Sequence, residues 1–203
     1  MKTWISLLIT LAVLSAVPTI RANGSAGSLR ELAVSKDDSL SALSQKLACD
    51  RIYRVQFPLF EWRRQAVVIF GFPSYSSAKA AGAKDAYAYA IQQSKLLVLL
   101  LRDNEIIQPQ SIAVDEVIFS KLLSAFASSE VFNLPSEWTS DGVDYVEVGA
   151  LDSGPVIVEC LGKTSKLVKR VYGQSAPVTG LADKIREILN SKIALNNVPA
   201  VNP

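Results

Sequence analysis

A proline-led β-hairpin between Gly154 and Gly173 constrains the fold of this chain more than any other stretch. Apolar residues lie on both faces of its first strand, which indicates a strand covered on both sides; these residues are Val156, Val158 and Cys160 on one face, and Ile157 and Leu161 on the other. Gly162–Ser165 supplies turn residues. The second strand, Lys166–Tyr172, is half polar, and its basic residues are typical of an exposed sheet edge. We expect the rest of the chain to complete a sheet around this hairpin.

The composition excludes several classes of function. The 203 residues, of which 49% are hydrophobic and 20% charged, suffice for one folded domain and a leader. Lys2 and Arg21 account for the formal net charge of +2, and both lie in the leader, so we expect no nucleic-acid partner. The chain has no histidine, which excludes Ser-His-Asp and Cys-His catalysis, and its 2 cysteines cannot form a four-cysteine zinc site. We therefore expect no metal and no cofactor.

Residues 1–22 are predicted to be a signal peptide. Lys2 provides a basic start, the run Trp4–Val17 is apolar apart from Ser and Thr, and small residues precede a cleavage point after Ala22. Cleavage after Ala16 is an alternative. A membrane anchor is the competing interpretation, but the apolar run is shorter than the roughly 20 residues of a spanning helix. We expect a secreted or periplasmic protein with no membrane partner after cleavage.

The mature chain is predicted to form one domain with a segment on either side. Residues 23–62 are interpreted as an N-terminal extension, with a broken amphipathic helix at Ser28–Leu47 and an irregular or short-strand segment at Cys49–Trp62. Residues 63–192 form the domain, and residues 193–203 are a tail.

A strand, a helix and a second strand are predicted to follow one another at the start of the domain. Ala66–Phe72 and Leu96–Leu101 are short apolar runs typical of buried strands. The Ala-rich stretch Ser77–Lys95 between them favours a helix. This order predicts a parallel, right-handed βαβ unit and hence an α/β fold.

Two more helices and a strand are predicted further along. Val143–Val148 alternates as a strand. The first helix places six apolar residues on one stripe: Val114, Val117, Ile118, Leu122, Ala125 and Phe126. The last helix has Thr179 as its N-cap, and its apolar face is formed by Leu181, Ile185, Ile188 and Leu189.

The order of these elements resembles the thioredoxin fold from Ala66 to Leu189. The resemblance rests on the strand–helix–strand unit, the Gly-Pro dipeptide, the hairpin stretches PVIVECLGK and VKRVYG, and the last helix. The resemblance implies a central mixed sheet with helices on both faces and a C-terminal β-hairpin plus helix. It also implies a cis Gly154–Pro155 bond, because Pro155 stands where thioredoxins carry a cis-proline. The stretch FEWRRQAVVIFGFPS also resembles the opening of a family of uncharacterised bacterial secreted thioredoxin-like proteins.

The redox motif of thioredoxins is missing from this chain. Thioredoxins carry Cys-x-x-Cys at the first strand-to-helix turn, whereas the corresponding residues 72–79 contain no cysteine. Disulfide exchange requires a thiolate of lowered pKa at that helix start. We therefore do not expect thioredoxin chemistry.

Ser74, Tyr75, Ser76 and Ser77 form a candidate binding site at a predicted helix start. Free backbone N–H groups there favour a phosphate, a carboxylate or a peptide carbonyl. Plain capping by Ser76 or Ser77 is the competing interpretation. Capping does not account for the aromatic ring of Tyr75.

Two groups of residues that contain carboxylates are weaker candidates for a functional site. Three oxygen-bearing residues after a predicted strand are possible ligands of a hard cation, although a solvated loop explains them more simply; they are Asp103, Asn104 and Glu105. Three carboxylates on strands are expected to be outward-facing charges: Asp144, Glu147 and Glu159.

Cys49 and Cys160 leave two interpretations open. In an oxidising compartment two lone cysteines tend to form a disulfide bond. Two buried, inert thiols are the alternative, because Cys160 lies in a predicted buried strand.

Two classes of function remain. The first is a non-catalytic thioredoxin-like binding protein, whose groove between Tyr75 and Gly154–Pro155 accepts a protein or peptide partner by sheet augmentation, as the resemblance implies. The second is a divergent thiol-dependent oxidoreductase-like enzyme that uses Cys160 or Cys49. The missing Cys-x-x-Cys motif and the missing histidine favour the first class. The sequence indicates neither the partner's identity nor the oligomeric state.

Overall fold

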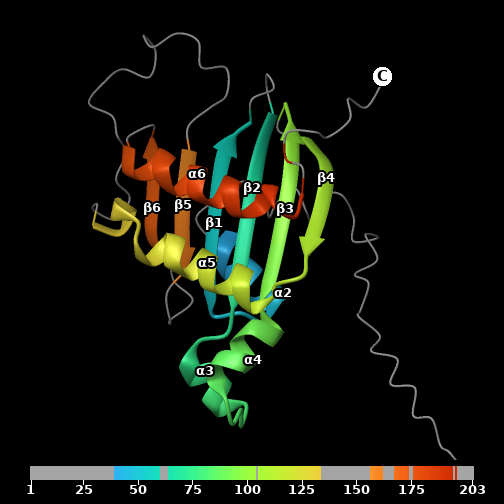
Figure 1. Cartoon of the computed structure of the whole chain (residues 1–203), viewed down its shortest axis with the longest axis vertical. Helices are drawn as coiled ribbons and strands as arrows, with labels where there is room; N and C mark the ends of the chain where they lie inside the picture. Colours follow the sequence, from blue (N-terminus) through green and yellow to red (C-terminus); the bar gives the residue numbers. More distant parts are fainter. Residues whose placement is uncertain are drawn as a thin grey trace, which may run out of the picture.

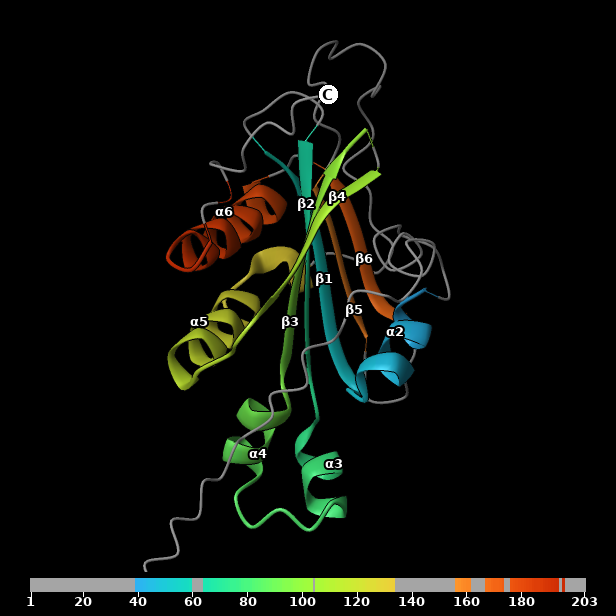
Figure 2. The ribbon, with the colours of Figure 1, turned by 90° about the vertical axis from the view of Figure 1, so that its right-hand side faces the viewer.

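A single antiparallel sheet forms the centre of the computed structural model, which describes residues 39–59, 64–103, 105–133, 156–161, 167–173, 176–193 and 195. The strands are β1 (Arg51–Pro58), β2 (Arg64–Phe72), β3 (Lys95–Arg102), β4 (Glu105–Ile112), β5 (Val156–Leu161) and β6 (Leu167–Gly173). The helices are α2 (Ser39–Leu47), α3 (Tyr75–Ala80), α4 (Ala86–Gln93), α5 (Glu116–Ala127), the 3-10 helix η1 (Glu130–Asn133) and α6 (Ala176–Asn190). The strand order is β4-β3-β2-β1-β5-β6, with α5 and α6 on one face and α2 on the other (Figure 1, Figure 2).

The sheet confirms one part of the fold prediction and corrects another. An α/β architecture with helices on both faces, ending in a hairpin and a helix, is confirmed. The mixed sheet and the parallel βαβ unit are wrong, because every pairing among the described strands is antiparallel. After its helical connection, β3 returns beside β2 in the opposite direction, with Val98 opposite Val68.

The helix predicted at Ser77–Lys95 is in fact two short helices, which explains the antiparallel return. Gly82 adopts a φ of 75° after α3, a left-handed conformation that ends the helix. Asp85 then caps α4 by accepting two backbone N–H bonds at 2.9 and 3.0 Å. With 8 residues α4 is about 12 Å long, whereas the 9 residues of β2 span about 30 Å. A helix this short cannot carry the chain back along the sheet, and residues 75–93, the α3–α4 lobe, protrude beyond the sheet end (Figure 1, Figure 2).

Alternating side chains divide the sheet into two buried faces. The α5–α6 face combines apolar strand residues with the inner sides of two helices; it includes Val55, Phe57, Val68, Phe70, Val98, Leu100, Phe119, Leu122, Leu181 and Ile185. The α2 face is smaller and includes Leu40, Leu43, Cys49, Ile52, Val67, Ile69, Leu99, Leu101 and Leu161. Because β2, β3 and β5 are buried on both faces, their sequences are nearly continuous apolar runs, as the sequence analysis expected.

The strand β1 corrects the domain boundary. The segment predicted to be irregular or a short strand is an 8-residue strand in the middle of the sheet, paired with β2 on one side and β5 on the other. It therefore belongs to the folded domain rather than to the extension predicted at residues 23–62. At the other end, Leu195 is 2% exposed and packs in the α5–α6 face, so the predicted tail at 193–203 begins within the core.

The strand β4 was not predicted. It pairs with β3 through a tight turn, where Arg102 lies opposite Glu105 and Asp103 has a φ of 50°. Asp and Asn tolerate this left-handed conformation, so the Asp-Asn dipeptide after an apolar run is a hairpin signal. Pro109 lies within β4, and a proline is acceptable there because β4 is an edge strand.

The helices α5 and α6 match the predicted helices with two corrections. Val117, expected on the buried stripe of α5, is 60% exposed because its neighbours Ile118 and Phe119 face the sheet. Thr179, expected as an N-cap, lies inside α6, which begins at Ala176.

Some predictions fall outside the described ranges. They concern the signal peptide at 1–22, the strand Val143–Val148 with Asp144 and Glu147, and the cis bond predicted for Gly154–Pro155. Among the helices that the structure describes, none combines the length and apolar character that crossing a membrane requires.

Candidate functional site

Asp50 joins the start of β1 to the start of α3. Its carboxylate accepts the backbone N–H of Ser74 at 2.5 Å, the hydroxyl of Ser74 at 2.5 Å and the hydroxyl of Ser77 at 2.8 Å. Burial raises the pKa of Asp50, but the hydrogen bonds from Ser74 and Ser77 outweigh it and hold the pKa below its ordinary value of 3.8. The carboxylate is ionised at neutral pH and fastens the first turn of α3 to the sheet.

This contact corrects the anion site predicted at Ser74–Ser77. The backbone N–H of Ser74 and the hydroxyls of Ser74 and Ser77 donate to a carboxylate of the chain itself rather than to an external anion. The capping interpretation is the one observed, although Ser74 is the N-cap rather than Ser76 or Ser77. Sequence reasoning missed Asp50 because it lies 24 residues before Ser74, in a segment predicted to be irregular.

The structure separates the two sides of the predicted binding groove. Phe72, which leads into α3, pairs with Arg51 at the start of β1, whereas Ile157 at the start of β5 pairs with Gln56. The five residue steps from Arg51 to Gln56 correspond to about 17 Å of strand. Although Pro155 lies outside the described ranges, the strand that follows it starts at the far end of the sheet from α3. In addition, β5 is paired with β1 and β6, which leaves it no free edge for an added strand.

The two cysteines lie on opposite faces of the sheet, and they form no disulfide bond with each other. Cys49 belongs to the α2 face. Cys160 shares the side of β5 with Val156 and Val158, which belong to the α5–α6 face. Since the sheet separates the two sulfur atoms, two buried thiols are observed instead of the disulfide bond.

Cys49 is poorly suited to thiol chemistry. It is 2% exposed, and its thiol donates a hydrogen bond to the carbonyl of Leu47 at 3.3 Å. Burial raises the pKa of Cys49 to about 11, against the lowering effect of Lys95. A thiol with this pKa is protonated at neutral pH and is a poor nucleophile. Cys49 is also tightly packed, because a Cβ on Gly71 would lie only 3.2 Å from the Cβ of Cys49.

A buried ion pair joins β1 to β5 on the α2 face. Arg54 Nε lies 2.5 Å from Glu159 Oε2, and the two side chains are 2% and 1% exposed. The prediction that Glu159 faces outward is therefore wrong. The residues stand directly opposite each other in the strand register. A slip of one residue would leave two separate charges in the interior, so the pair opposes misregister of these strands.

The acidic turn after β3 shows no sign of a cation site. Asp103 and Glu105 are exposed, and Asn104 lies outside the described ranges. Within the described part of the chain, no group of three or more Asp, Glu, Cys or His residues is placed to hold a metal ion.

The α3–α4 lobe presents two aromatic side chains to solvent. Tyr75 is 67% exposed and Tyr87 is 47% exposed. Lys79 Nζ lies 5.4 Å from the centre of the Tyr75 ring, which is a cation–π distance. The edge of Tyr87 packs against Phe119 of α5 with 5.6 Å between ring centres. The lobe is thus held at both helices, by Asp50 at α3 and by Phe119 at α4.

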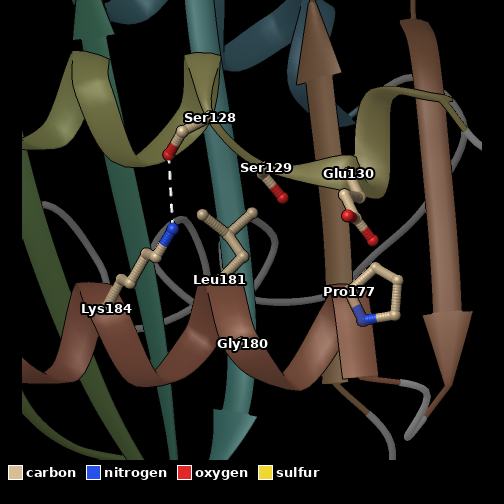
Figure 3. Close-up of a pocket in the computed structure, with 7 residues that line it drawn as sticks. All are labelled: Ser128, Ser129, Glu130, Pro177, Gly180, Leu181 and Lys184. Carbon is tan, nitrogen blue, oxygen red and sulfur yellow. Dashed lines mark hydrogen bonds between the residues drawn. The ribbon is translucent and has the colours of Figure 1, made fainter.

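A cleft of about 240 Å³ opens between the end of α5 and the start of α6 (Figure 3). Sequence reasoning singled out none of its polar residues, because no local motif connects the two segments that form it. Its lining combines hydroxyl, charged and apolar groups from Ser128, Ser129, Glu130, Pro177, Gly180, Leu181 and Lys184.

Several polar groups of the described residues already have partners within the chain. Ser74 and Ser77 donate to Asp50, the thiol of Cys49 is protonated, and the buried pair on the α2 face neutralises its own charges. No protein-family model, no curated protein and no solved structure matches this chain. The lobe and the cleft are therefore the features from which a function is inferred.

Proposed function

We propose that this chain is an exported, non-catalytic interaction protein whose α3–α4 lobe binds a protein or peptide partner. The leader pattern of residues 1–22 supports export to a secreted or periplasmic location. The observation that carries the binding role is the exposure of Tyr75 and Tyr87 on a protruding lobe. Tyrosine is enriched in protein interfaces and at their energetic centres, because it buries a large ring while keeping a polar hydroxyl.

The lobe is held rigidly enough to act as a recognition surface. Asp50 fixes the start of α3 through Ser74 and Ser77, and Phe119 supports the ring of Tyr87. A surface that is ordered before binding loses less conformational entropy when a partner docks. The hydrogen bonds from Ser74 and Ser77 to Asp50 argue against the predicted anion site, but they support binding of a protein or peptide partner by the lobe.

The charges of the lobe indicate the chemistry of its partner. Lys79 and Lys84 are exposed, whereas the carboxylate of Asp85 is occupied in capping α4. Ammonium groups beside tyrosine rings suit a partner surface that combines carboxylates with apolar side chains. We therefore expect the interaction to weaken as the salt concentration rises.

The experiment is a comparison of four immobilised proteins incubated with the exported protein fraction of the source cells. We expect the wild type and Val117→Ala to retain the same partner, because Val117 is an exposed apolar residue outside the lobe. The Tyr75→Ala and Tyr87→Ala variants should each retain at least about fivefold less, as removal of an interface tyrosine costs 1 kcal/mol or more. Circular dichroism confirms that each variant is folded. Equal retention by all four proteins would refute the role of the lobe.

A thioredoxin-like relationship also stays a proposal. The hairpin of β5 and β6 followed by α6, and the helices on both faces of the sheet, support it. The antiparallel pairing of β2 with β3 argues against it. The enzyme alternative receives no support from Cys49, whose thiol is buried and protonated.

A further inference from the structure

The cleft between α5 and α6 has the features of a small-molecule site that is separate from the lobe. Ser128, Ser129 and Glu130 form one wall, and the residues of α6 at positions 177, 180, 181 and 184 form the other (Figure 3). These four positions lie on one face of a helix. At about 240 Å³, the space is large enough for a molecule of several heavy atoms.

Gly180 is the residue that opens this cleft. It lies in the interior of the 15-residue helix α6, where glycine is less favourable than alanine. Apart from its chain neighbours and the nearby backbone of α6 itself, no described atom comes within 4 Å of the position that a Cβ would occupy on Gly180, so close packing does not require a glycine. The missing side chain leaves the wall of the cleft hollow instead.

The cleft carries opposite charges at its two ends. Lys184 donates a hydrogen bond to the hydroxyl of Ser128 at 3.3 Å at one end, and Glu130 lies over Pro177 at the other (Figure 3). Lys184 follows Pro177 by seven residue steps in α6, which is about 10 Å along the helix. Within the described part of the chain, neither Lys184 nor Glu130 forms an ion pair. The apolar side chain of Leu181 lies between the two ends.

We propose that this cleft binds a small zwitterion, either a free amino acid or a dipeptide. The carboxylate of the ligand binds the ammonium of Lys184 and the hydroxyl of Ser128, and the ammonium of the ligand binds the carboxylate of Glu130. The apolar side chain of the ligand contacts Leu181 and Pro177. Because Pro177 and Lys184 are about 10 Å apart along α6, the longer backbone of a dipeptide reaches both ends of the cleft better than that of a single amino acid.

The test is a titration of the purified chain followed by NMR chemical shifts, with Ala-Leu and leucine as probes. Typical binding efficiencies for small ligands predict a Kd of about 1 mM for Ala-Leu, and weaker binding of leucine. The acetylated and amidated probe N-acetyl-leucine amide lacks both charges and should not bind. Tighter binding of leucine than of Ala-Leu would make the free amino acid the ligand and would overturn the dipeptide assignment.

Matched variants locate the binding site. Lys184→Met and Glu130→Gln should each weaken binding of Ala-Leu about fivefold, whereas Lys121→Met and Glu187→Gln, at other exposed positions of α5 and α6, should leave it unchanged. Gly180→Leu should abolish binding by filling the cleft. Gly180→Ala, a smaller change, should raise the melting temperature, which controls for damage to α6.

Three results would overturn the proposal: no saturable shift at a tenfold excess over the expected Kd, equal binding of the uncharged probe, or unchanged binding by folded Gly180→Leu. The Tyr75→Ala and Tyr87→Ala variants should retain the ligand, because the lobe is a different part of the fold. Failure of the cleft and failure of the lobe are therefore distinguishable.

Discussion

Replacement of Asp50 tests whether its carboxylate holds the α3–α4 lobe in place. The carboxylate accepts three hydrogen bonds, two from Ser74 and one from Ser77. A hydrogen bond to a charged group contributes about 1.5–3 kcal/mol, but the three share one partly exposed acceptor and do not add. We expect Asp50→Ala to lower the free energy of unfolding by about 2–3 kcal/mol, and Asp50→Asn by about 1–2 kcal/mol, because Asn keeps one acceptor oxygen.

The effect of Asp50→Asn should depend on pH in a defined direction. The pKa of Asp50 in the folded protein lies below that of the unfolded chain, which is about 3.9. The stabilisation by the carboxylate is therefore complete above about pH 4 and is lost as the pH falls through the folded-state pKa. The difference between wild type and Asp50→Asn should be largest near pH 7 and should shrink as the pH falls through the lowered pKa of Asp50.

The measurement is urea unfolding at several pH values, combined with hydrogen exchange of residues 75–93. A double-mutant cycle of Asp50→Asn with Ser77→Ala should give a coupling energy of about 1 kcal/mol, and faster exchange should be confined mainly to the lobe. Glu187→Gln, an exposed carboxylate on α6, serves as the control and should change little. Strict additivity of the two substitutions, or wild-type stability of Asp50→Asn at pH 7, would refute the role of the carboxylate.

Three other predictions follow from the buried groups and from the leader. Arg54→Met should cost about 3–5 kcal/mol in urea unfolding because it breaks a buried ion pair by removing one of its members. The double replacement Arg54→Met with Glu159→Leu should cost less than the single one, and a larger cost for the double variant would contradict this. Mass analysis without reductant should find no disulfide bond between Cys49 and Cys160, and iodoacetamide should modify Cys49 slowly until the protein unfolds. Fast modification of Cys49 at neutral pH would contradict its raised pKa. Exported protein should begin at Asn23 by N-terminal sequencing, and retention of the initiator methionine would disprove cleavage.

In the connection between β2 and β3, the alanine-rich composition outweighed two local signals that mark the end of one helix and the start of another. The Ala-rich stretch Ser77–Lys95 predicted one long helix, and a long helix predicted a parallel crossover. Gly82 and Asp85 interrupt that stretch with a left-handed residue and an N-cap. Both are visible in the sequence as a helix stop and a helix start. Their consequence for strand direction follows only when the length of the remaining helix is compared with the length of the strand.

The central position of β1 in the sheet was missed for a different reason. Its residues alternate between apolar and polar side chains, and Arg54 in its middle argues against a central position. In that position Arg54 forms a buried ion pair with Glu159, which lies 105 residues away in the sequence. No pattern local to β1 contains this information.

The sequence by itself determined the elements whose burial follows from a local apolar pattern. These are β2, β3 and the hairpin of β5 and β6, together with α5 and α6, and the missing histidine and Cys-x-x-Cys motif limited the available chemistry. The tertiary structure decided how these elements pair. Strand direction and register set Asp50 against Ser74, Arg54 against Glu159, and the two cysteines on opposite faces. A single residue in sequence carries no record of its partner across a sheet, because that contact exists only once the strands have aligned.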